Sequence, residues 1–165
     1  TVDVETLRTT HEEARTVLDH QIESVRNLDD KAARTFRLNA ILLGLIFTVV
    51  SFLVRSDSFQ IGPYVNVGTI TGTLALVVSF IGAVVAFTVT DMQTGIGPTD
   101  IERLIDRGYT EREWLTLLVR SEGSWIEWNN RQQSRNVTWL SISHFALILA
   151  VLCFVLGIAK PLLLG

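Results

Sequence analysis

The sequence predicts an all-α membrane protein with three transmembrane helices, long cytoplasmic helical extensions and an oligomeric bundle. Apolar residues make up 48% of the 165 residues, and the mean hydropathy is +0.35. Charged residues make up only 19%, against about a quarter in an average soluble domain. No charged residue occurs in 38–54, 58–90 or 136–159. The interior of a soluble domain of this size is too small to bury three such stretches, which excludes a simple cytosolic enzyme.

The N-terminal segment, residues 1–37, is predicted to form a helix that continues into the first span at 38–54. It contains neither glycine nor proline, the residues that most weaken a helix. The span is about 25 Å long as a helix, close to the thickness of the hydrocarbon core of a bilayer. Asn39 is the one amide within it. This amide either fixes the packing of the helices or hydrogen-bonds to water at the cytoplasmic interface.

The second span is predicted at 64–90, with its helix beginning near Tyr64, after the turn residues Gly62 and Pro63. Small residues recur along one face of this span and predict close packing against another helix. The sequence leaves open whether that helix belongs to the same chain or to a neighbouring copy. The helix-packing residues, together with Asn39, are Gly68, Gly72, Ser79, Gly82 and Ala86.

An insert at 91–135 joins the second span to the third and is also predicted to be helical. Two capping boxes, Thr99–Glu102 and Thr110–Glu113, predict the starts of a short helix and of a long one. No Gly-Pro break separates the long helix from the third span at 136–159. Residues 38–165 therefore form a three-span membrane domain that carries a cytoplasmic helical insert.

The basic residues predict the direction in which the chain crosses the membrane. Twelve of the fourteen Lys and Arg residues lie in 1–37 and 91–135. Cytoplasmic segments carry an excess of such residues, so both segments are assigned to the cytoplasm. The prediction is a multi-pass protein of the cell membrane, embedded in the lipid bilayer, with a cytoplasmic N-terminus and an external C-terminus.

Both long helices carry apolar residues at the 3.5-residue spacing of left-handed coiled coils, including Leu7, Leu18 and Val25 in the first and Leu115 and Leu118 in the last. The two arms of one chain can pair in this way, or several copies can form a stalk. We favour a homo-oligomer because one pair of arms gives a thin core. A tetramer is the predicted size.

A stripe of amide and small residues runs along one side of the last helix. In an oligomer this stripe can line a central axis and leave room for water, and in the alternative it lets helices pack closely. The candidate pore-lining residues are Asn129, Gln132, Asn136, Ser143, Ala146, Ala150, Cys153 and Gly157.

No pattern of catalytic or metal-binding residues stands out. The sequence has no phosphate-binding loop, no dinucleotide-binding glycine set and no HExxH motif. His11 and His20 do not share a helix face, which disfavours a metal site. The chain is predicted not to be an enzyme and to need no metal or cofactor. His144, inside the third span, is expected to bond to a neighbouring helix.

Tryptophans cluster with arginines before the third span, where the candidate ligand or partner residues are Trp125, Trp128, Arg131 and Arg135. Such residues stack nucleic-acid bases or bind nucleotides. They also serve as core or headgroup anchors, which is the more common outcome. The expected partner on the cytoplasmic side is a soluble regulatory protein or a nucleotide or oligonucleotide ligand.

The segment Leu28-Asp29-Asp30-Lys31-Ala32-Ala33-Arg34, which leads into Asn39 and the first span, resembles small prokaryotic membrane effectors of antiviral defence, of the SLATT and Pycsar-effector type. The resemblance covers roughly residues 20–135. It implies a protein that oligomerises and permeabilises the membrane when a partner enzyme or a nucleotide signal triggers it.

Two functions are expected from these features. The first is an oligomeric, ion-channel-like effector that is gated through its cytoplasmic helices. The alternative is a non-conducting membrane anchor or scaffold that docks a soluble partner enzyme. Leakage of ions from vesicles distinguishes the two.

Overall fold

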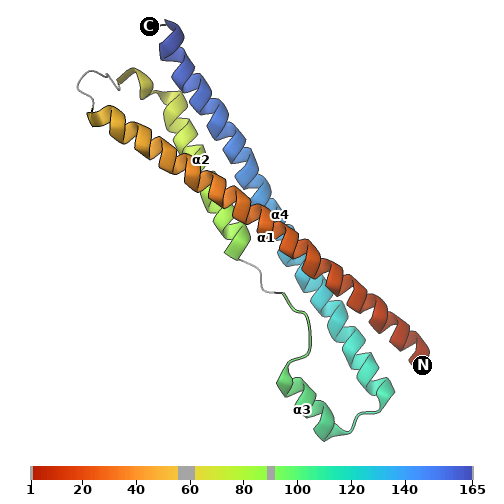
Figure 1. Cartoon of the computed structure of the whole chain (residues 1–165). Coiled ribbons are helices and arrows are strands. Elements are labelled where there is room, and N and C mark those ends of the chain that lie inside the picture. The colour runs from red at the N-terminus through yellow and green to blue at the C-terminus, as the bar shows by residue number, and fades with distance from the viewer. Residues whose placement is uncertain (1, 56–61, 89–91, 165) are drawn as a thin grey trace. The chain divides into compact units, whose positions relative to one another are not determined.

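The computed structural model describes residues 2–55, 62–88 and 92–164, and these ranges contain helices and turns but no strand. The prediction of an all-α fold is therefore confirmed. The elements are α1 (Val4–Arg55), a 3-10 turn (Gly62–Tyr64), α2 (Val67–Thr88), α3 (Pro98–Arg107) and α4 (Glu111–Leu164) (Figure 1).

Three helices, α1, α2 and α4, are long and apolar enough to cross a membrane. Helices α1 and α4 contain the predicted spans 38–54 and 136–159. Helix α2 begins at Val67 rather than near Tyr64, which lies in the preceding 3-10 turn. Its 22 residues are about 33 Å long, enough to cross a hydrocarbon core. Residues 89 and 90 of the predicted second span lie outside the described residues.

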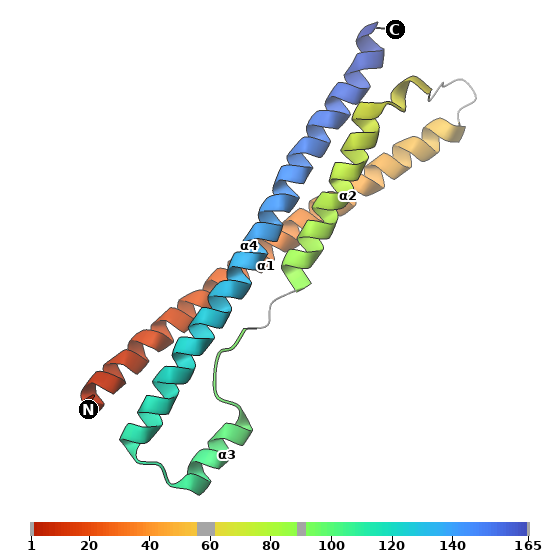
Figure 2. The same cartoon turned by 180° about the vertical axis from the view of Figure 1, so that it is seen from behind.

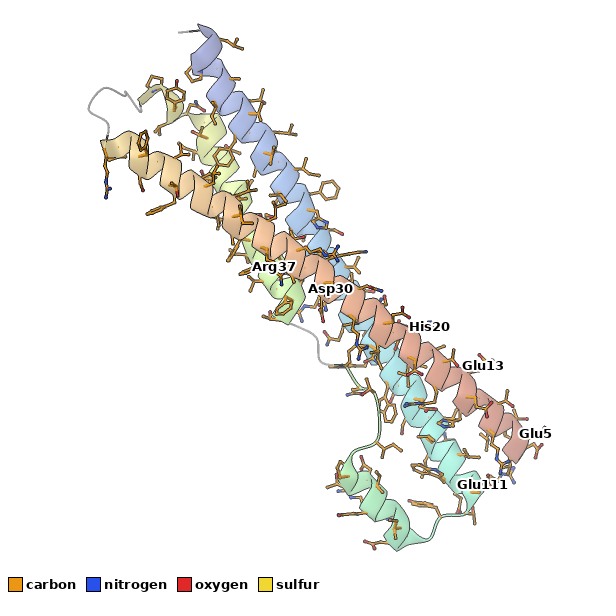
Figure 3. All side chains as sticks on the ribbon, viewed as in Figure 1. Glu5, Glu13, His20, Asp30, Arg37 and Glu111 are labelled. Carbon is orange, nitrogen blue, oxygen red and sulfur yellow. The ribbon has the colours of Figure 1, made fainter. Side chains whose placement is uncertain are left out.

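The chain divides into two compact units. The polar unit contains residues 2–27 and 92–135, and the apolar unit contains residues 28–55, 62–88 and 136–164. Helices α1 and α4 contribute to both units. Polar and charged side chains, including Glu5, Glu13 and His20, are exposed along α1 in the polar unit (Figure 3).

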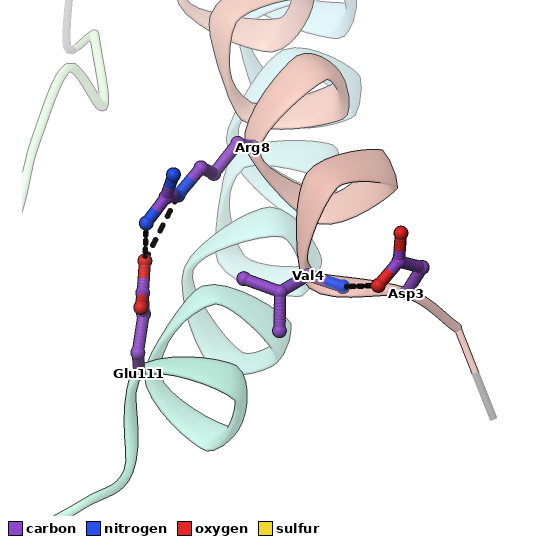
Figure 4. A network of polar contacts seen from close by, with 4 residues as sticks. All are labelled: Asp3, Val4, Arg8 and Glu111. Carbon is purple, nitrogen blue, oxygen red and sulfur yellow. Dashed lines mark hydrogen bonds and ion pairs between the residues drawn. The ribbon is translucent and has the colours of Figure 1, made fainter.

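In the polar unit, α1 and α4 run parallel. Arg8 forms an ion pair with Glu111 near the start of both helices (Figure 4), and Ser24 bonds to Gln133 further along both. The core between them consists of the heptad leucines and valine, namely Leu7, Leu18, Val25, Leu115 and Leu118. The two arms of one chain thus pair with each other, which is one of the two alternatives that the sequence left open. A stalk of several copies stays a prediction.

In the apolar unit, α1 and α4 run parallel to each other and antiparallel to α2 (Figure 2). Leu76, Ala75 and Ala150 form one buried cluster, and Ala32, Ala86 and Leu140 form another. The side of α2 that carries Ile70, Leu74 and Ile81 is exposed. The small face of α2 is buried, as the residue pattern predicts, and the exposed face is aliphatic.

The small face of α2 packs against α4 of the same chain, which answers the question that the sequence left open. A Cβ atom added at Gly82 would lie 3.1 Å from Ser143 Cβ, and one added at Gly68 would lie 2.9 Å from Gly157 Cα. Added carbon at either position would meet backbone or short side chains. Glycine is therefore what allows the two helices to approach this closely.

The two predicted capping boxes have different outcomes. The Thr110 amide donates to Glu113 Oε2 over 2.9 Å, and the Glu113 amide donates to Thr110 Oγ1 over 3.4 Å, so the box that opens α4 is confirmed. The box at Thr99–Glu102 is wrong, because α3 begins at Pro98 with Gly97 as an N-cap that makes no side-chain bond. Proline suits this first position since it has no amide proton that needs an acceptor.

Candidate functional site

One polar side chain from each helix of the apolar unit meets in its interior. Asn39 Nδ2 donates to Ser79 Oγ over 2.9 Å, and Ser143 Oγ donates to the Ser79 carbonyl over 2.7 Å. The two serine oxygens are 3.2 Å apart. All three side chains are fully buried. They link α1, α2 and α4 at one level.

These residues meet because each lies on the face that its helix buries. Asn39 occupies a heptad position of α1, Ser79 lies on the small face of α2, and Ser143 lies on the stripe of α4. Hydrogen bonds between helices within a membrane contribute about 0.6 kcal/mol each on average. The direct effect on stability is modest, whereas the requirement for partners fixes the axial register of the three helices.

Asn136 is a second buried polar side chain of the apolar unit. It is 1% exposed, and within the described residues neither Oδ1 nor Nδ2 has a hydrogen-bond partner. Asn136 precedes Ser143 by two helical turns and lies on the same side of α4. A buried amide left without partners costs about 1–3 kcal/mol. We call Asn39, Ser79, Ser143 and Asn136 the polar seam.

His144 bonds to a neighbouring helix, as the sequence analysis expects. Its Nε2 lies 2.9 Å from Thr35 Oγ1 on α1. The single proton of the Thr35 hydroxyl is donated to the Lys31 carbonyl over 2.9 Å. The threonine oxygen therefore accepts from His144, so Nε2 of the imidazole carries a proton.

The candidate pore-lining residues are covered by helices of their own chain. Asn129, Asn136, Ser143, Ala150 and Gly157 are buried, and Gln132, Ala146 and Cys153 are half-buried. Asn129, in the polar unit, donates to Gln21 Oε1 over 3.2 Å and to the Gln93 carbonyl over 3.0 Å. For this stripe to line an axis, the helices that cover α4 must move away from it.

Most of the predicted helix-packing residues lie between helices. Gly72, Ser79, Gly82, Ala86 and Asn39 are buried, and Gly68 is half-buried. The sequence analysis missed Asn66, whose Nδ2 donates to the Gly157 carbonyl over 2.8 Å. An asparagine one residue before an apolar helix is a typical N-cap, and this signal was present in the sequence.

The predicted ligand residues do not form one site. Trp128 is 42% exposed, Arg131 pairs with Glu127 on the same helix, and Arg135 is exposed. Trp125 lines a cavity of the polar unit together with Arg103 and Arg107 of α3, which the sequence analysis did not select. Arg103 and Arg107 are four residues apart and therefore lie on one face of α3, and this spacing could have identified them from the sequence.

A buried carboxylate of the polar unit has a histidine as its partner. Both oxygens of the fully buried Glu122 lie close to His11 Nδ1, Oε1 at 2.9 Å and Oε2 at 3.0 Å, and the hydrogen bond is made to Oε2. Across the described residues, no three His, Cys, Asp or Glu side chains form a group that fits a metal ion.

Comparison of the chain with protein-family models, with curated proteins and with solved structures found no match. Its function is therefore inferred from its own residues.

Proposed function

We propose that the protein is an ion-channel-like membrane effector, which oligomerises in a lipid bilayer and opens a water-filled path when its polar unit receives a signal. The observation that carries this proposal is the polar seam, and above all the buried amide of Asn136, which has no hydrogen-bond partner among the described residues.

The outer surface of the apolar unit supports a position in lipid. Large apolar side chains such as Phe47, Phe145 and Leu156 are 69–75% exposed. Soluble proteins rarely expose apolar surface this extensively. Lipid tails would cover these side chains. The apolar stretch of α2 is more buried within the chain than those of α1 and α4.

The polar seam favours a channel-like protein over a passive anchor. A buried amide without a partner destabilises the state in which it is buried. A passive anchor gains nothing from that cost, whereas water in an open state would satisfy both Asn136 and Ser143. Polar side chains that face the interior of a membrane bundle can hold helices together or line a pathway for ions or water, and an amide without a partner favours the second role.

More than one copy is needed for such a path. The interior of the apolar unit is filled by Leu76, Ala83 and Ala150, each at most 1% exposed. Opening therefore requires α4 to separate from α2 and to face an axis shared with other copies, for which a tetramer is the predicted size. No ring of charges lines the seam, so weak charge selectivity or gating by dewetting is expected.

The basic residues and the sequence resemblance support a cytoplasmic position of the polar unit and a biological role for the protein. The basic residues of 1–37 and 91–135 assign the polar unit to the cytoplasm, where a partner protein or a nucleotide signal would act. The resemblance of residues 28–34 to SLATT and Pycsar-type effectors is the basis for proposing a role in prokaryotic antiviral defence.

A non-conducting anchor that docks a soluble enzyme is the second candidate. It is favoured by the close packing of the α4 stripe within one chain, where Gly82 meets Ser143 and Gly68 meets Gly157. Helices packed this closely would resist the separation that a pore requires.

Ion flux from liposomes tests the proposal. The full chain is reconstituted at increasing protein-to-lipid ratios under an applied potential, and flux should rise more steeply than protein density. Asn136→Leu should abolish flux without changing the mass of the detergent-solubilised particle. Ile148→Leu is the control, because Ile148 is on the same helix and faces outward. A monomeric particle, unchanged flux in Asn136→Leu, or no flux in the wild type would contradict the proposal, and the last result would favour the anchor.

A further inference from the structure

A cavity of about 240 Å³ lies in the polar unit between α3 and the first half of α4. It has two chemically different walls. One wall carries Trp114 and Trp125 of α4, and the other carries Arg103 and Arg107 of α3. Tyr109, in the turn between the helices, also lines the cavity.

The aromatic wall follows from helical spacing. Trp114 and Trp125 are separated by about three turns of α4 and therefore share one face. Leu118 lies between them and is buried against the core, whereas both indole rings are only half-buried. Part of each ring thus borders the cavity and has apolar surface to offer to a ligand.

The cationic wall has one guanidinium whose charge is not neutralised by a carboxylate. Arg103 lies 3.5 Å from Asp100 in an ion pair. Arg107 Nη1 donates to the Tyr109 hydroxyl over 3.2 Å, and among the described residues it forms no ion pair. The hydrogen bond to Tyr109 raises the pKa of Arg107, so the residue stays charged.

We propose that this cavity binds a planar aromatic anion of the nucleoside monophosphate class. Its ring would lie against Trp114 and Trp125, and its anionic group would accept hydrogen bonds from Arg107. Stacking on aromatic side chains and donation from arginine are the two interactions that such a ligand requires.

The available space fits a ligand of this size. An apolar cavity of about 150 Å³ holds one benzene ring, and the present cavity is larger than that. A second hollow of about 490 Å³ adjoins it and shares Ile96, Asp100 and Trp125. The two adjoining hollows therefore leave room for a ligand larger than one ring, such as a base that is joined through a sugar to an anionic group.

Calorimetric titration of the full chain in detergent tests the site. Adenosine monophosphate is compared with adenosine, which has the ring alone, and with inorganic phosphate, which has the anion alone. The monophosphate should bind at least about tenfold more tightly than either, as expected for one charge-assisted hydrogen bond. Arg107→Gln should lower its affinity to that of adenosine. Trp125→Phe should weaken adenosine and the monophosphate alike.

Two control variants make the result specific. Arg131→Gln removes a guanidinium from α4 outside the cavity, and Trp128→Phe changes a tryptophan that does not line it. Both should bind as the wild type does. Equal affinity for adenosine and its monophosphate, or the same loss in Arg131→Gln as in Arg107→Gln, would overturn the assignment.

This inference rests on the proposed function, because the ligand would be the signal that the polar unit receives. Its binding is nevertheless measured in an experiment that involves no ion flux. An Arg107→Gln variant that conducts but does not bind leaves the channel proposal intact. A wild type that binds but never conducts contradicts only the channel proposal, and one that conducts but binds none of the three probes contradicts only the ligand site.

Discussion

Asn66 supplies the Gly157 carbonyl with the hydrogen bond that Pro161 cannot give it. In an uninterrupted helix this carbonyl would accept from the amide of residue 161, four residues later, but proline has no amide proton. Asn66 Nδ2 lies 2.8 Å from the Gly157 oxygen, and Asn66 Oδ1 accepts from the Thr69 amide over 3.2 Å. One side chain thus caps α2 and repairs α4.

Asn66→Asp is predicted to destabilise the apolar unit. Aspartate keeps the oxygen that caps α2, but it loses the donor to Gly157 and leaves that carbonyl unsatisfied. The expected cost is about 1–3 kcal/mol. Denaturant unfolding in detergent measures it, with Asn130→Asp as a control at an exposed asparagine of α4.

The role of Pro161 makes this prediction specific. In a Pro161→Ala background the helix supplies its own amide proton to Gly157, so the cost of Asn66→Asp should largely disappear. A cost that is the same in both backgrounds would show that the Asn66 donor does not substitute for the missing amide.

Gly82→Ala is predicted to destabilise the packing of α2 on α4. The added carbon would lie 3.1 Å from Ser143 Cβ and 3.2 Å from the Trp139 carbonyl, so the helices must separate slightly. A cost of about 1–3 kcal/mol is typical of such overpacking. Gly44→Ala is the matched control, because a Cβ atom there meets nothing within 4 Å.

The control variant Gly44→Ala is itself predicted not to lower stability. Alanine is favoured over glycine within a helix by about 0.8–1 kcal/mol, so Gly44→Ala should be neutral or stabilising in thermal unfolding. Equal effects of the two variants would mean that the contact between Gly82 and Ser143 does not limit the approach of α2 to α4.

Periodicity in the sequence predicts which faces of the helices are buried. Leu18, Ala32 and Asn39 recur at heptad positions of α1, and all three are buried. The small face of α2 is likewise buried, and its aliphatic face is exposed. These outcomes depend only on helical geometry and on the size of side chains, which the sequence contains.

Contacts between distant segments were not predictable in the same way. The bond from Asn66 joins residues 91 positions apart in the chain, and no local pattern indicates its partner. The cavity beside Trp125 depends on how turns at both ends place α3 against α4. The start of α3 was missed because Gly97 and Pro98 compete with the Thr99 capping box, and the proline geometry prevails.

Glu113 is predicted to titrate below its ordinary pKa of 4.5. The hydrogen bonds from the Thr110 amide and hydroxyl lower the pKa, because they stabilise the carboxylate. A lowered pKa in the folded state means that Glu113 stabilises the start of α4 above the unfolded pKa. This contribution is lost as the pH falls through the folded pKa.

Carboxyl NMR titration measures this effect directly. In Thr110→Val the midpoint of Glu113 should rise towards 4.5, since the hydroxyl donor is gone while the amide donor stays. Glu102 on α3, also exposed, serves as an internal reference. A Glu113 midpoint that does not move in Thr110→Val would exclude the hydroxyl as a cause.

The two asparagines of the polar seam are predicted to respond differently to the same substitution. Asn39→Leu removes an amide that bonds to Ser79 and should destabilise the apolar unit by about 0.6–1.7 kcal/mol. Asn136→Leu removes an amide with no partner among the described residues. That change should be neutral or stabilising, because a buried unsatisfied group is replaced by an apolar one of similar size. Unfolding of both variants in the same detergent measures the difference, and an equal loss of stability would mean that Asn136 is partnered in the folded protein.

Because the same Asn136→Leu variant is expected to lose ion flux, a stable protein that no longer conducts would separate the role of this amide in opening from any role in folding.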